Sequence, residues 1–299
     1  IIDFVVVAPD DPLVAGTVDA LHREGIACFG PEAKAAIIEG SKVFSKNLMK
    51  KYDIPTAAYE TFENSAEAIE YIKKGSFPVV IKADGLALGK GVIIAEDFAE
   101  AEKAVKSIME DMQFGESGKK IVVEEYLSGP EVSVLCFTDG KTIVPMVSSM
   151  DHKRAHDNDE GLNTGGMGAI APNPYYTKEI ADTCMEKIFR KTVDAMNTEG
   201  RTIRGCLYFG LMLTNKGPCV IEYNCRFGDP ETQVVLPLLE SDLLEIMIAT
   251  EKGELDKTSV KFSRKSACCV IAASGGYPEK YEKGKKITLP SNINAQIYH

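Results

Sequence analysis

The sequence predicts an α/β protein, and two patterns indicate this class. Residues 4–29 read as an apolar run, a helix and a second apolar run, an order that suits a parallel sheet with helices on its faces. Residues 60–137 alternate strands and helices around a glycine-rich loop, which predicts a compact α+β unit. The chain has 299 residues and is 44% hydrophobic, enough for about two domains.

The remaining elements are expected from periodicity and turn chemistry. Pro9 to Pro12 form a turn, and residues 54–56 are extended because the residue before a proline avoids the helical region. Asp, Asn and Gly fill residues 151–174 and predict a long polar loop, which at this length is usually functional. The other expected elements are helices over 14–23, 33–51, 65–74, 98–112, 178–199 and most of 230–251, strands over 78–82, 92–94, 120–126, 131–137 and 141–149, a hairpin of 205–214 with 218–224, and a strand-rich tail from residue 261.

Charge and composition exclude several classes. The net charge of −10 disfavours nucleic acid as a partner. No apolar run approaches the ~20 residues of a membrane span, and no basic segment marks a signal peptide. The eight cysteines contain no Cys-x-x-Cys pair, which favours buried free thiols and a cytoplasmic location. The chain opens without Met inside an apolar strand pattern, so we expect a fragment that lacks upstream residues.

Glu222 and Asn224 form a candidate cation site. They lie two apart on a predicted strand, so their side chains share one face. Mg²⁺ typically takes one or two protein oxygens together with nucleotide phosphates. The pattern alone is weak, because Glu-x-Asn occurs in many strands by chance.

Lys82 ends an apolar strand and is followed by the glycine-rich stretch 85–91. A lysine there can project into a cleft as a point charge for phosphate, and the glycines let backbone N–H groups approach a polyphosphate. The spacing is not that of a Walker A loop. An ordinary hairpin turn with an exposed lysine explains the segment equally well.

Glu124 and Glu131 flank a predicted strand edge that could present backbone groups to an adenine and an acid to ribose hydroxyls. A solvated acidic edge is an equally good interpretation. Arg226 follows the candidate cation site and could hold a phosphate or a developing negative charge. It could instead pair with Asp229, a suitable N-cap for a helix beginning at Pro230, and both interpretations can hold together.

A second glycine-rich stretch, residues 163–168, lies in the long polar loop and could wrap a small ligand with main-chain donors. The Asp-His-Lys-Arg segment at 151–154 precedes it. His152 and His156 are four apart but lack the adjacent Glu of a zincin, so solvated loop histidines are favoured over a metal site. Lysines, carboxylates, glycines and a cation pair together suit phosphoryl transfer, in which catalysis is mostly positioning and charge neutralisation.

Seven segments in this order resemble the ATP-grasp superfamily, and within it the glycinamide ribonucleotide synthetase branch. They are Pro-Leu-Val-Ala-Gly at 12–16, Phe-Gly-Pro at 29–31, Glu-Gly-Ser-Lys at 39–42, the run 81–92, Asp-His-Lys-Arg at 151–154, Asn-Thr-Gly-Gly-Met-Gly at 163–168 and Asn-Cys-Arg-Phe-Gly-Asp-Pro-Glu at 224–231. Each segment is weak by itself, but the ordered set is specific and covers nearly the whole chain. The resemblance implies an ATP-grasp fold with a partial Rossmann-like N-terminal domain (1–40), an ATP-grasp domain (41–257) whose mobile lid covers about 60–130, and the start of a β-rich C-terminal lobe (258–299).

The resemblance also implies chemistry. ATP would phosphorylate the carboxylate of glycine, and the amine of 5-phosphoribosylamine would then displace phosphate to give glycinamide ribonucleotide. The implied nucleotide contacts are Lys42, Lys82, Gly89, Lys90, Gly91, Glu124, Tyr126, Leu127 and Glu131, and the implied ligands of Mg²⁺ or Mn²⁺ are Glu222 and Asn224. Arg226 and Lys82 would be catalytic, and the implied substrate-side residues are Asp151, Lys153, Asn163, Gly165, Gly166, Met167, Gly168 and Asp229.

Two alternatives remain open at this stage. The chain could be another ATP-grasp carboxylate–amine ligase, which activity with an amino acid other than glycine would reveal. It could also be a fragment that binds nucleotide without turnover. We expect no nucleic acid or membrane partner, and a monomer or weak dimer.

Overall fold

The computed structural model describes residues 2–87, 91–289 and 292–299. The N-terminal segment pairs β1 (Val5–Val6) with β2 (Cys28–Phe29) in parallel, and α1 (Asp10–Val14) and α2 (Thr17–Arg23) lie between them in sequence. The βαβ-like order predicted from sequence is present. The turn predicted at Pro9–Pro12 is wrong, because Pro12 lies in the first turn of α1, where a missing N–H costs nothing. Gly16, at φ 88°, separates the two helices.

A helical region was expected over 33–51, and in the structure it consists of two helices. α3 (Ala33–Gly40) ends at Ser41, whose backbone is extended, and α4 (Lys42–Lys51) begins immediately after it. The Ser41 hydroxyl caps α4 by accepting a hydrogen bond from Phe44 N at 3.0 Å. This break places Lys42 on the first turn of a new helix.

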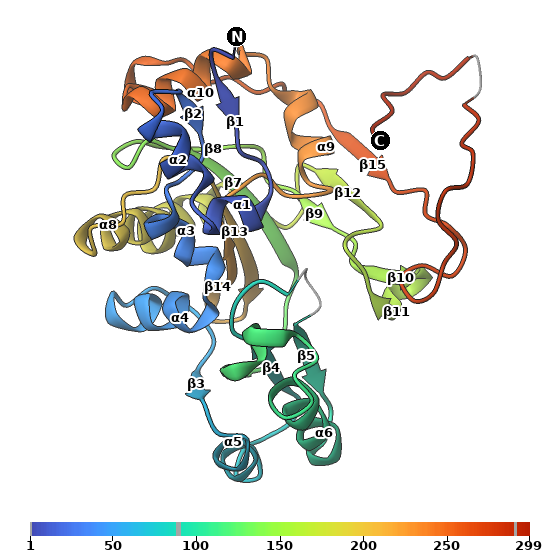
Figure 1. Cartoon of the computed structure of the whole chain (residues 1–299). Helices are drawn as coiled ribbons and strands as arrows, with labels where there is room; N and C mark the ends of the chain where they lie inside the picture. The colour runs from blue at the N-terminus through green and yellow to red at the C-terminus, as the bar shows by residue number, and fades with distance from the viewer. Residues whose placement is uncertain (1, 88–90, 290–291) are drawn as a thin grey trace.

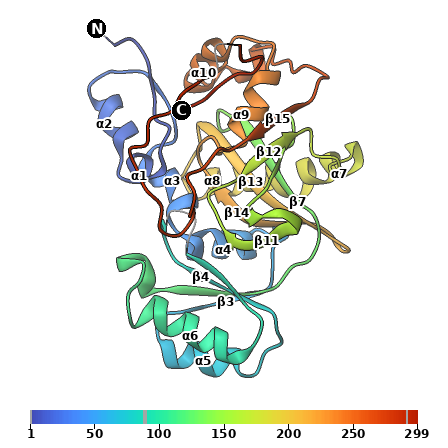
Figure 2. The same ribbon diagram turned by 90° about the vertical axis from the view of Figure 1, so that its right-hand side faces the viewer.

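Residues 59–125 form the distal unit, which lies at the bottom of Figures 1 and 2. Its antiparallel sheet has the order β3 (Tyr59–Phe62), β6 (Ile121–Glu125), β4 (Val79–Ala83), β5 (Val92–Ala95). The helices α5 (Ser65–Ile72) and α6 (Phe98–Met109) pack against the sheet around buried Ile81, Val105 and Ile108, and the short 3₁₀ helix η1 (Gly115–Lys119) precedes β6. The unit predicted over 60–137 is therefore too long, because the strand after residue 130 belongs to another sheet.

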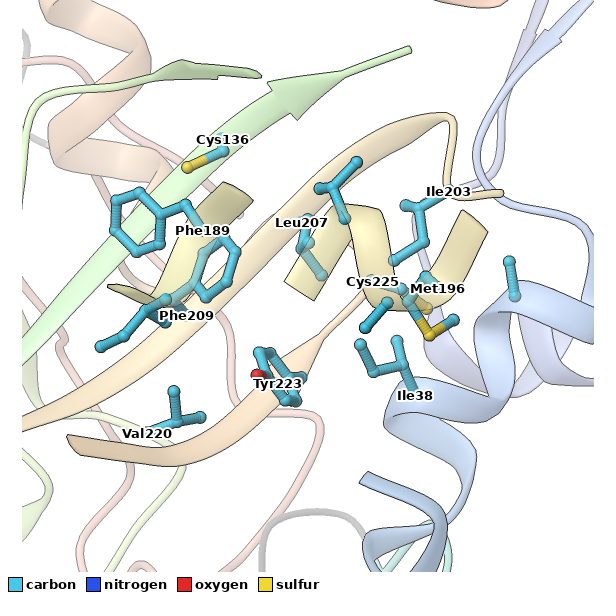
Figure 3. Close-up of a cluster of buried hydrophobic side chains, with 14 of the residues drawn as sticks. Ile38, Cys136, Phe189, Met196, Ile203, Leu207, Phe209, Val220, Tyr223 and Cys225 are labelled. Carbon is cyan, nitrogen blue, oxygen red and sulfur yellow. The ribbon is translucent and has the colours of Figure 1, made fainter. Parts of the chain in front are cut away.

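The central sheet has the order β14 (Gly217–Asn224), β13 (Gly205–Thr214), β7 (Glu131–Thr138), β8 (Ile143–Pro145), and all its strand pairs are antiparallel. The predicted hairpin of residues 205–224 is confirmed. Against one face packs a continuous helical stretch formed by α7 (Lys178–Cys184), a π-helical turn (Met185–Phe189) and α8 (Arg190–Thr198). In this core the rings of Phe189 and Phe209 pack together, with their centroids 4.2 Å apart (Figure 3).

The opposite face of the central sheet is covered by C-terminal helices, which enclose a second core around Phe137, Tyr208 and Ile246. These helices are α9 (Thr232–Val235), the 3₁₀ turn η4 (Leu236–Leu238), α10 (Leu243–Lys252) and the 3₁₀ turn η5 (Leu255–Lys257). Among the described residues, no helix is both long and apolar enough to traverse a lipid bilayer.

The long loop predicted over 151–174 is wrong, because the structure contains strands there. β10 (Arg154–His156) and β11 (Glu160–Asn163) form a short antiparallel ribbon around a 3₁₀ turn (Asp157–Asp159). β12 (Gly168–Ala171) lies between β9 (Met150–Asp151) and β15 (Ala267–Val270). The ribbon is polar and largely exposed, so it carries no apolar alternation that sequence reasoning could detect.

The tail predicted to be strand-rich from residue 261 is wrong beyond β15, the one strand that its described residues form. Beyond Val270, the described residues contain no helix or strand, and the apolar side chains of Ile287 and Leu289 are exposed by 72% and 47%. The apolar pattern of this tail resembles that of a strand. A strand is stable only when other strands pair with it, and no strand of the described chain pairs with the residues beyond Val270.

Candidate active site

Glu222 on β14 lies at the centre of a cluster of cations. Its strand partner is Gly210 on β13, where a Cβ would stand only 2.8 Å from Cγ of Glu222, so the glycine makes room for this side chain. Burial would raise the pKa of Glu222, but the positive charges of Lys153, Lys82, Lys42 and Arg226 together hold it below its ordinary value. The carboxylate is therefore ionised at neutral pH, and it is half-buried, so a ligand can still reach it.

Lys42 and Lys82 approach Glu222 from different elements. Lys42 is the first residue of α4, and its Nζ donates to the carbonyl of Gly85 at 2.9 Å, in the loop after β4. Burial lowers the pKa of Lys42, and the neighbouring charge of Lys82 lowers it further. Lys82, on β4 of the distal unit, donates from Nζ to the carbonyl of Ile221 at 3.0 Å, next to Glu222. Both lysines thus bridge the distal unit and the main body.

A buried ion triad supports this bridge. Glu124, whose side chain is 2% exposed, has one carboxylate oxygen 3.0 Å from Nζ of Lys82 and the other 2.9 Å from Nζ of Lys46. Nζ of Lys46 also donates to the hydroxyl of Thr56 at 2.8 Å, and burial lowers the pKa of Lys46 to about 8 despite the attraction of Glu124. Two lysines therefore engage the Glu124 carboxylate, and its backbone lies inside the sheet, in register with Tyr59 of β3 and Val80 of β4.

Sequence reasoning missed Lys46. It follows Lys42 by four residues on α4, a spacing that places both side chains on one face of the helix, and this was the available signal. From the sequence alone, Lys46 could not be distinguished from an ordinary surface lysine, because its partner Glu124 lies on β6, which packs against α4 only in the folded chain.

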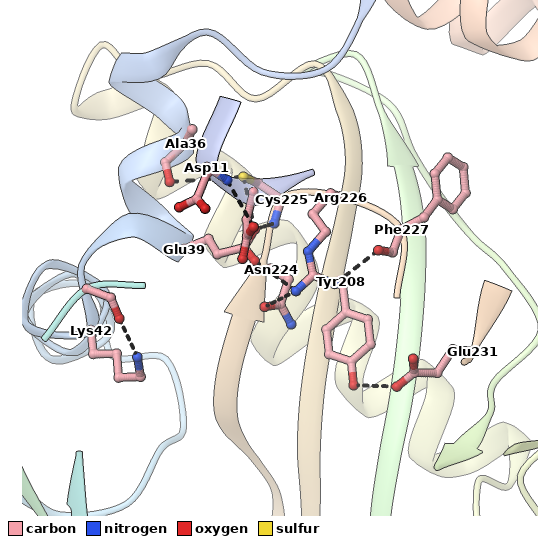
Figure 4. Close-up of polar contacts among 12 residues, drawn as sticks. Asp11, Ala36, Glu39, Lys42, Tyr208, Asn224, Cys225, Arg226, Phe227 and Glu231 are labelled. Carbon is pink, nitrogen blue, oxygen red and sulfur yellow. Dashed lines mark hydrogen bonds and ion pairs between the residues drawn. The ribbon is translucent and has the colours of Figure 1, made fainter. Parts of the chain in front are cut away.

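Arg226 pairs with Glu39 and not with Asp229 (Figure 4). The guanidinium lies 3.0 Å from the Glu39 carboxylate and also donates to the carbonyl of Phe227 at 3.0 Å and to the amide oxygen of Asn224 at 3.4 Å. Burial raises the pKa of Glu39, and the charge of Arg226 opposes that shift. Glu39 also accepts a hydrogen bond from the backbone N–H of Cys225 at 2.8 Å, so α3 fixes the end of β14.

The structural role expected for Asp229 is wrong. Asp229 is exposed and accepts a hydrogen bond from Gln233 at 2.6 Å, whereas α9 begins at Thr232 with Glu231 at its N-cap position. Glu39 was missed because a Glu inside an apolar helix carries no local signal that its partner lies 187 positions away, at Arg226.

Lys153 is the cation of the cluster that lies near Asp151. Oδ1 of Asp151 is buried and has no hydrogen-bond partner among the described residues. Burial, followed by the nearby charge of Glu231, raises the pKa of Asp151 to about 7. Lys153 forms an ion pair with Glu131 at 2.9 Å, and although burial lowers the pKa of Lys153, the charges of Glu222 and Glu131 more than offset it and raise the pKa.

The glycine-rich stretch 165–168 lies beside Asp151. At Gly166, whose φ is 121°, a Cβ would stand 2.4 Å from the ring of Pro230 and 3.0 Å from Oδ1 of Asp151. Met167 and Gly168 line a cavity of about 230 Å³ together with Asp151. Asn163, in contrast, is exposed on β11 and pairs by backbone register with Arg154. Neither this cavity nor a larger one of about 300 Å³ between β8 and α8 is lined by Glu222 or its four cations, but the first includes Asp151.

The remaining predicted nucleotide contacts lie around the connection from β6 to β7 and the β4–β5 loop. Tyr126 is 44% exposed and Leu127 is half-buried, both in the β6–β7 connection. Gly91 is buried, and a Cβ there would stand 2.6 Å from Cβ of Ala87. Gly89 and Lys90 lie outside the described residues. His152 and His156 do not belong to a metal-binding cluster, since the described part of the chain contains no group of three or more His, Cys, Asp or Glu side chains able to hold a metal.

The residues present fit a nucleotide held with a divalent cation. An ionised carboxylate and an amide oxygen on one strand face supply two hard oxygen ligands, as Mg²⁺ prefers when phosphates complete its coordination. Four cations around them can neutralise a polyphosphate. The arrangement can thus position phosphoryl groups and stabilise the negative charge that develops during their transfer.

Comparisons with known proteins agree with this chemistry. The family model described as phosphoribosylglycinamide synthetase, ATP-grasp (A) domain, matches residues 40–232, and the corresponding N-domain model matches residues 1–39. The phosphoribosylamine–glycine ligase of Caldanaerobacter subterraneus subsp. tengcongensis is 49% identical over 100% of this chain and 72% of its own length. That of Clostridium acetobutylicum is 50% identical over 99% of this chain and 71% of its own length.

Solved structures support the same assignment. The crystal structure of phosphoribosylamine–glycine ligase from Thermotoga maritima matches with a TM-score of 0.79 at 39% identity, covering 89% of this chain and 67% of that one. The biotin carboxylase domain of Hydrogenobacter thermophilus 2-oxoglutarate carboxylase, solved with MgADP, ADP and bicarbonate, matches with a TM-score of 0.70 at 18% identity, covering 89% of this chain and 57% of that one, and shows the fold alone. The α/β fold is therefore of the ATP-grasp type, and the chain belongs to the phosphoribosylglycinamide synthetase family.

Proposed function

We propose that this chain joins glycine to 5-phosphoribosylamine at the expense of ATP, giving glycinamide ribonucleotide, ADP and phosphate. The observation that carries the proposal is the ionised Glu222 facing Lys42, Lys82, Lys153 and Arg226, in a chain that is about half identical to phosphoribosylamine–glycine ligases over its whole length. The proposed course has two steps. The glycine carboxylate attacks the γ-phosphorus of ATP and ADP leaves, and the substrate amine then attacks the acyl phosphate, releasing phosphate and a proton.

The nucleotide is assigned to the seam between the distal unit and the main body. Lys42 and Lys82 would hold its phosphates, since each already reaches across this seam. The loop containing Gly89, Lys90 and Gly91 would approach the phosphates, and the nearby strand end would hold the adenosine. The residues concerned are Glu124 in β6, Tyr126 and Leu127 in the β6–β7 connection, and Glu131 at the start of β7.

The cation is assigned to Glu222 and Asn224. Mg²⁺ or Mn²⁺ would supply charge neutralisation and alignment of the phosphates. Arg226 would neutralise the transferred phosphoryl group, and the contacts of its guanidinium with Glu39 and the Phe227 carbonyl, which fix its direction, support this role. Lys82 would act with it as the second catalytic cation.

The substrates are assigned to the side of Glu222 that carries Asp151 and Lys153. Oδ1 of Asp151, which has no hydrogen-bond partner among the described residues, suits an ammonium group, and Met167 and Gly168 border the cavity that Asp151 lines. Asn163 and Asp229, both exposed, would contact the substrate only at the rim of this site.

The same proposal covers domain roles and cellular setting. The distal unit would act as a lid over the nucleotide, within an ATP-grasp domain of residues 41–257 that follows the N-terminal domain 1–40 and precedes the C-terminal segment 258–299. All eight cysteines are free, as suits a reducing cytoplasm, and the chain would work as a monomer or weak dimer without nucleic acid or membrane partners.

The test is ADP release from Mg-ATP in the presence of glycine and freshly generated 5-phosphoribosylamine, with each component omitted in turn. Release that needs all three supports the proposal. Release with another amino acid and not with glycine would assign the chain to a different ligase reaction. Nucleotide binding without release under any combination would contradict the proposed activity.

A further inference from the structure

Tyr277, in the segment that follows β15, contacts the glycine-rich stretch beside Asp151. The backbone N–H of Gly165 donates a hydrogen bond to the Tyr277 hydroxyl at 3.0 Å, across 112 positions of sequence. Figures 1 and 2 show the C-terminal segment passing next to the β10–β11 ribbon.

The stretch is anchored on its other side by β9 and the residues after it. Met167 N donates to the His152 carbonyl at 2.7 Å, and His152 N donates to the Gly168 carbonyl at 2.9 Å. The hydroxyl of Thr164 donates to the Lys153 carbonyl at 2.9 Å, which fixes the start of the turn. These bonds hold both ends of the stretch and leave the amide of Gly165 to Tyr277.

The C-terminal segment completes the anchoring. Ile271 N donates to the Met167 carbonyl at 3.0 Å, continuing the pairing of β15 with β12. The chain then turns, with Tyr277 N donating to the Ser274 carbonyl at 3.1 Å, so that the half-buried Tyr277 ring comes back toward Gly165. The ring also packs edge-on against Tyr281, with centroids 5.5 Å apart.

The position of this stretch determines the shape of the cavity at Asp151. Gly166 packs so closely on Pro230 and Asp151 that a single Cβ would not fit. A displacement of a few tenths of an ångström at Gly165 therefore changes the space around Oδ1 of Asp151, the buried oxygen that has no partner among the described residues.

We infer that Tyr277 is a positioning residue for the substrate pocket, and that its hydroxyl holds residues 165–168 where the ammonium group of glycine can reach Asp151. The inference rests on the proposed function, since it assigns this pocket to glycine. The inference predicts that loss of the Tyr277 hydroxyl weakens the binding of glycine and not of ATP, because Lys42 and Lys82, the proposed phosphate contacts, lie on α4 and β4.

The test compares Tyr277→Phe with Tyr281→Phe in the whole chain. Both substitutions remove one hydroxyl from the same segment, and among the described residues only the Tyr277 hydroxyl has a hydrogen bond to the main chain. Loss of one neutral hydrogen bond is expected to raise the KM for glycine about three- to tenfold in Tyr277→Phe, with the KM for ATP unchanged. Tyr281→Phe should leave both constants at wild-type values.

Amide hydrogen exchange without substrates tests the hydroxyl contact independently of turnover. The Gly165 amide should exchange faster in Tyr277→Phe than in the wild type or in Tyr281→Phe, while the amide of Ile271 stays unchanged. Equal exchange in all three proteins would overturn the inference whatever the enzyme does. Equal KM values for glycine, or equal changes for glycine and ATP, would also overturn it. The wild-type protein could show no ADP release while the Gly165 amide still exchanges faster in Tyr277→Phe. That result would refute the proposed function and, with it, the glycine assignment, but it would establish the Tyr277–Gly165 contact.

Discussion

Arg226 and Glu39 form a salt bridge of 3.0 Å that joins the end of β14 to α3. Glu39 thereby fixes Arg226, the proposed catalytic cation, from the side of the N-terminal segment. The second oxygen of Glu39 accepts a hydrogen bond from the backbone N–H of Cys225, which precedes Arg226. The N-terminal segment is thus part of the support of the site, although none of its residues was predicted to touch a ligand.

Glu39→Gln is expected to lower kcat about tenfold or more while leaving the KM for ATP within about twofold. The amide can still accept from Cys225, but it carries no charge to direct the guanidinium of Arg226, and misplacement of a charge-stabilising group reduces the rate more than it reduces binding. The measurement is steady-state ADP release with all three substrates. Glu32→Gln is the control, since Glu32 forms a half-exposed pair with Lys34 at 3.0 Å. Equal rates in the two variants would contradict the role of Glu39.

Lys46→Met is expected to lower the free energy of unfolding by about 3 kcal/mol, because it leaves the buried Glu124 with only one of its two lysines. Chemical denaturation provides the measurement. Lys51→Met, on the same helix, removes an exposed pair with Glu199 and should cost less than about 1 kcal/mol. If the two variants lose the same stability, the triad does not hold the distal unit to the body.

Asp151 should give the chain a pH-dependent instability that Asp151→Asn removes. Its pKa is raised from 3.8 to about 7 on folding, so between these values the folded state binds more protons than the unfolded state, and stability falls as pH rises. Relative to the wild type, Asp151→Asn should therefore gain on the order of 2 kcal/mol between pH 4 and pH 7, a value reduced for partial solvent access. Denaturation curves at pH 4.5 and 7.5 measure this difference, and parallel pH profiles would show that Asp151 titrates normally.

The sequence predicted the parts of the site that depend on local pattern. The hairpin of β13 and β14 follows from its alternation and turn, so Glu222 and Asn224 could be placed on one strand in advance. Lys46 and Glu39 could not be found in this way, because their importance depends on partners that are distant in sequence, Glu124 and Arg226.

The errors at the β10–β11 ribbon and at the tail share one physical origin. The β10–β11 ribbon is polar on both faces, so it lacks the apolar alternation that distinguishes a strand from a loop. The tail has an apolar pattern but no neighbouring strand in the described chain, and pairing decides whether such a pattern becomes a sheet. Local pattern therefore gave the wrong answer wherever the outcome depended on tertiary contacts.

Gly210→Ala is expected to weaken cation binding more than it weakens the fold. The added Cβ would lie 2.8 Å from Cγ of Glu222, closer than such atoms approach, so the Glu222 side chain must move away from its four cations. We expect Mn²⁺ affinity in the presence of ATP to fall about tenfold, by analogy with the loss of groups that orient metal ligands. Electron paramagnetic resonance of free Mn²⁺ measures the affinity. Gly275→Ala is the matched control, because nothing lies within 4 Å of its Cβ and its φ is not in the left-handed region. Unchanged Mn²⁺ affinity in a folded Gly210→Ala variant, equal to that of Gly275→Ala, would remove Glu222 from the cation site.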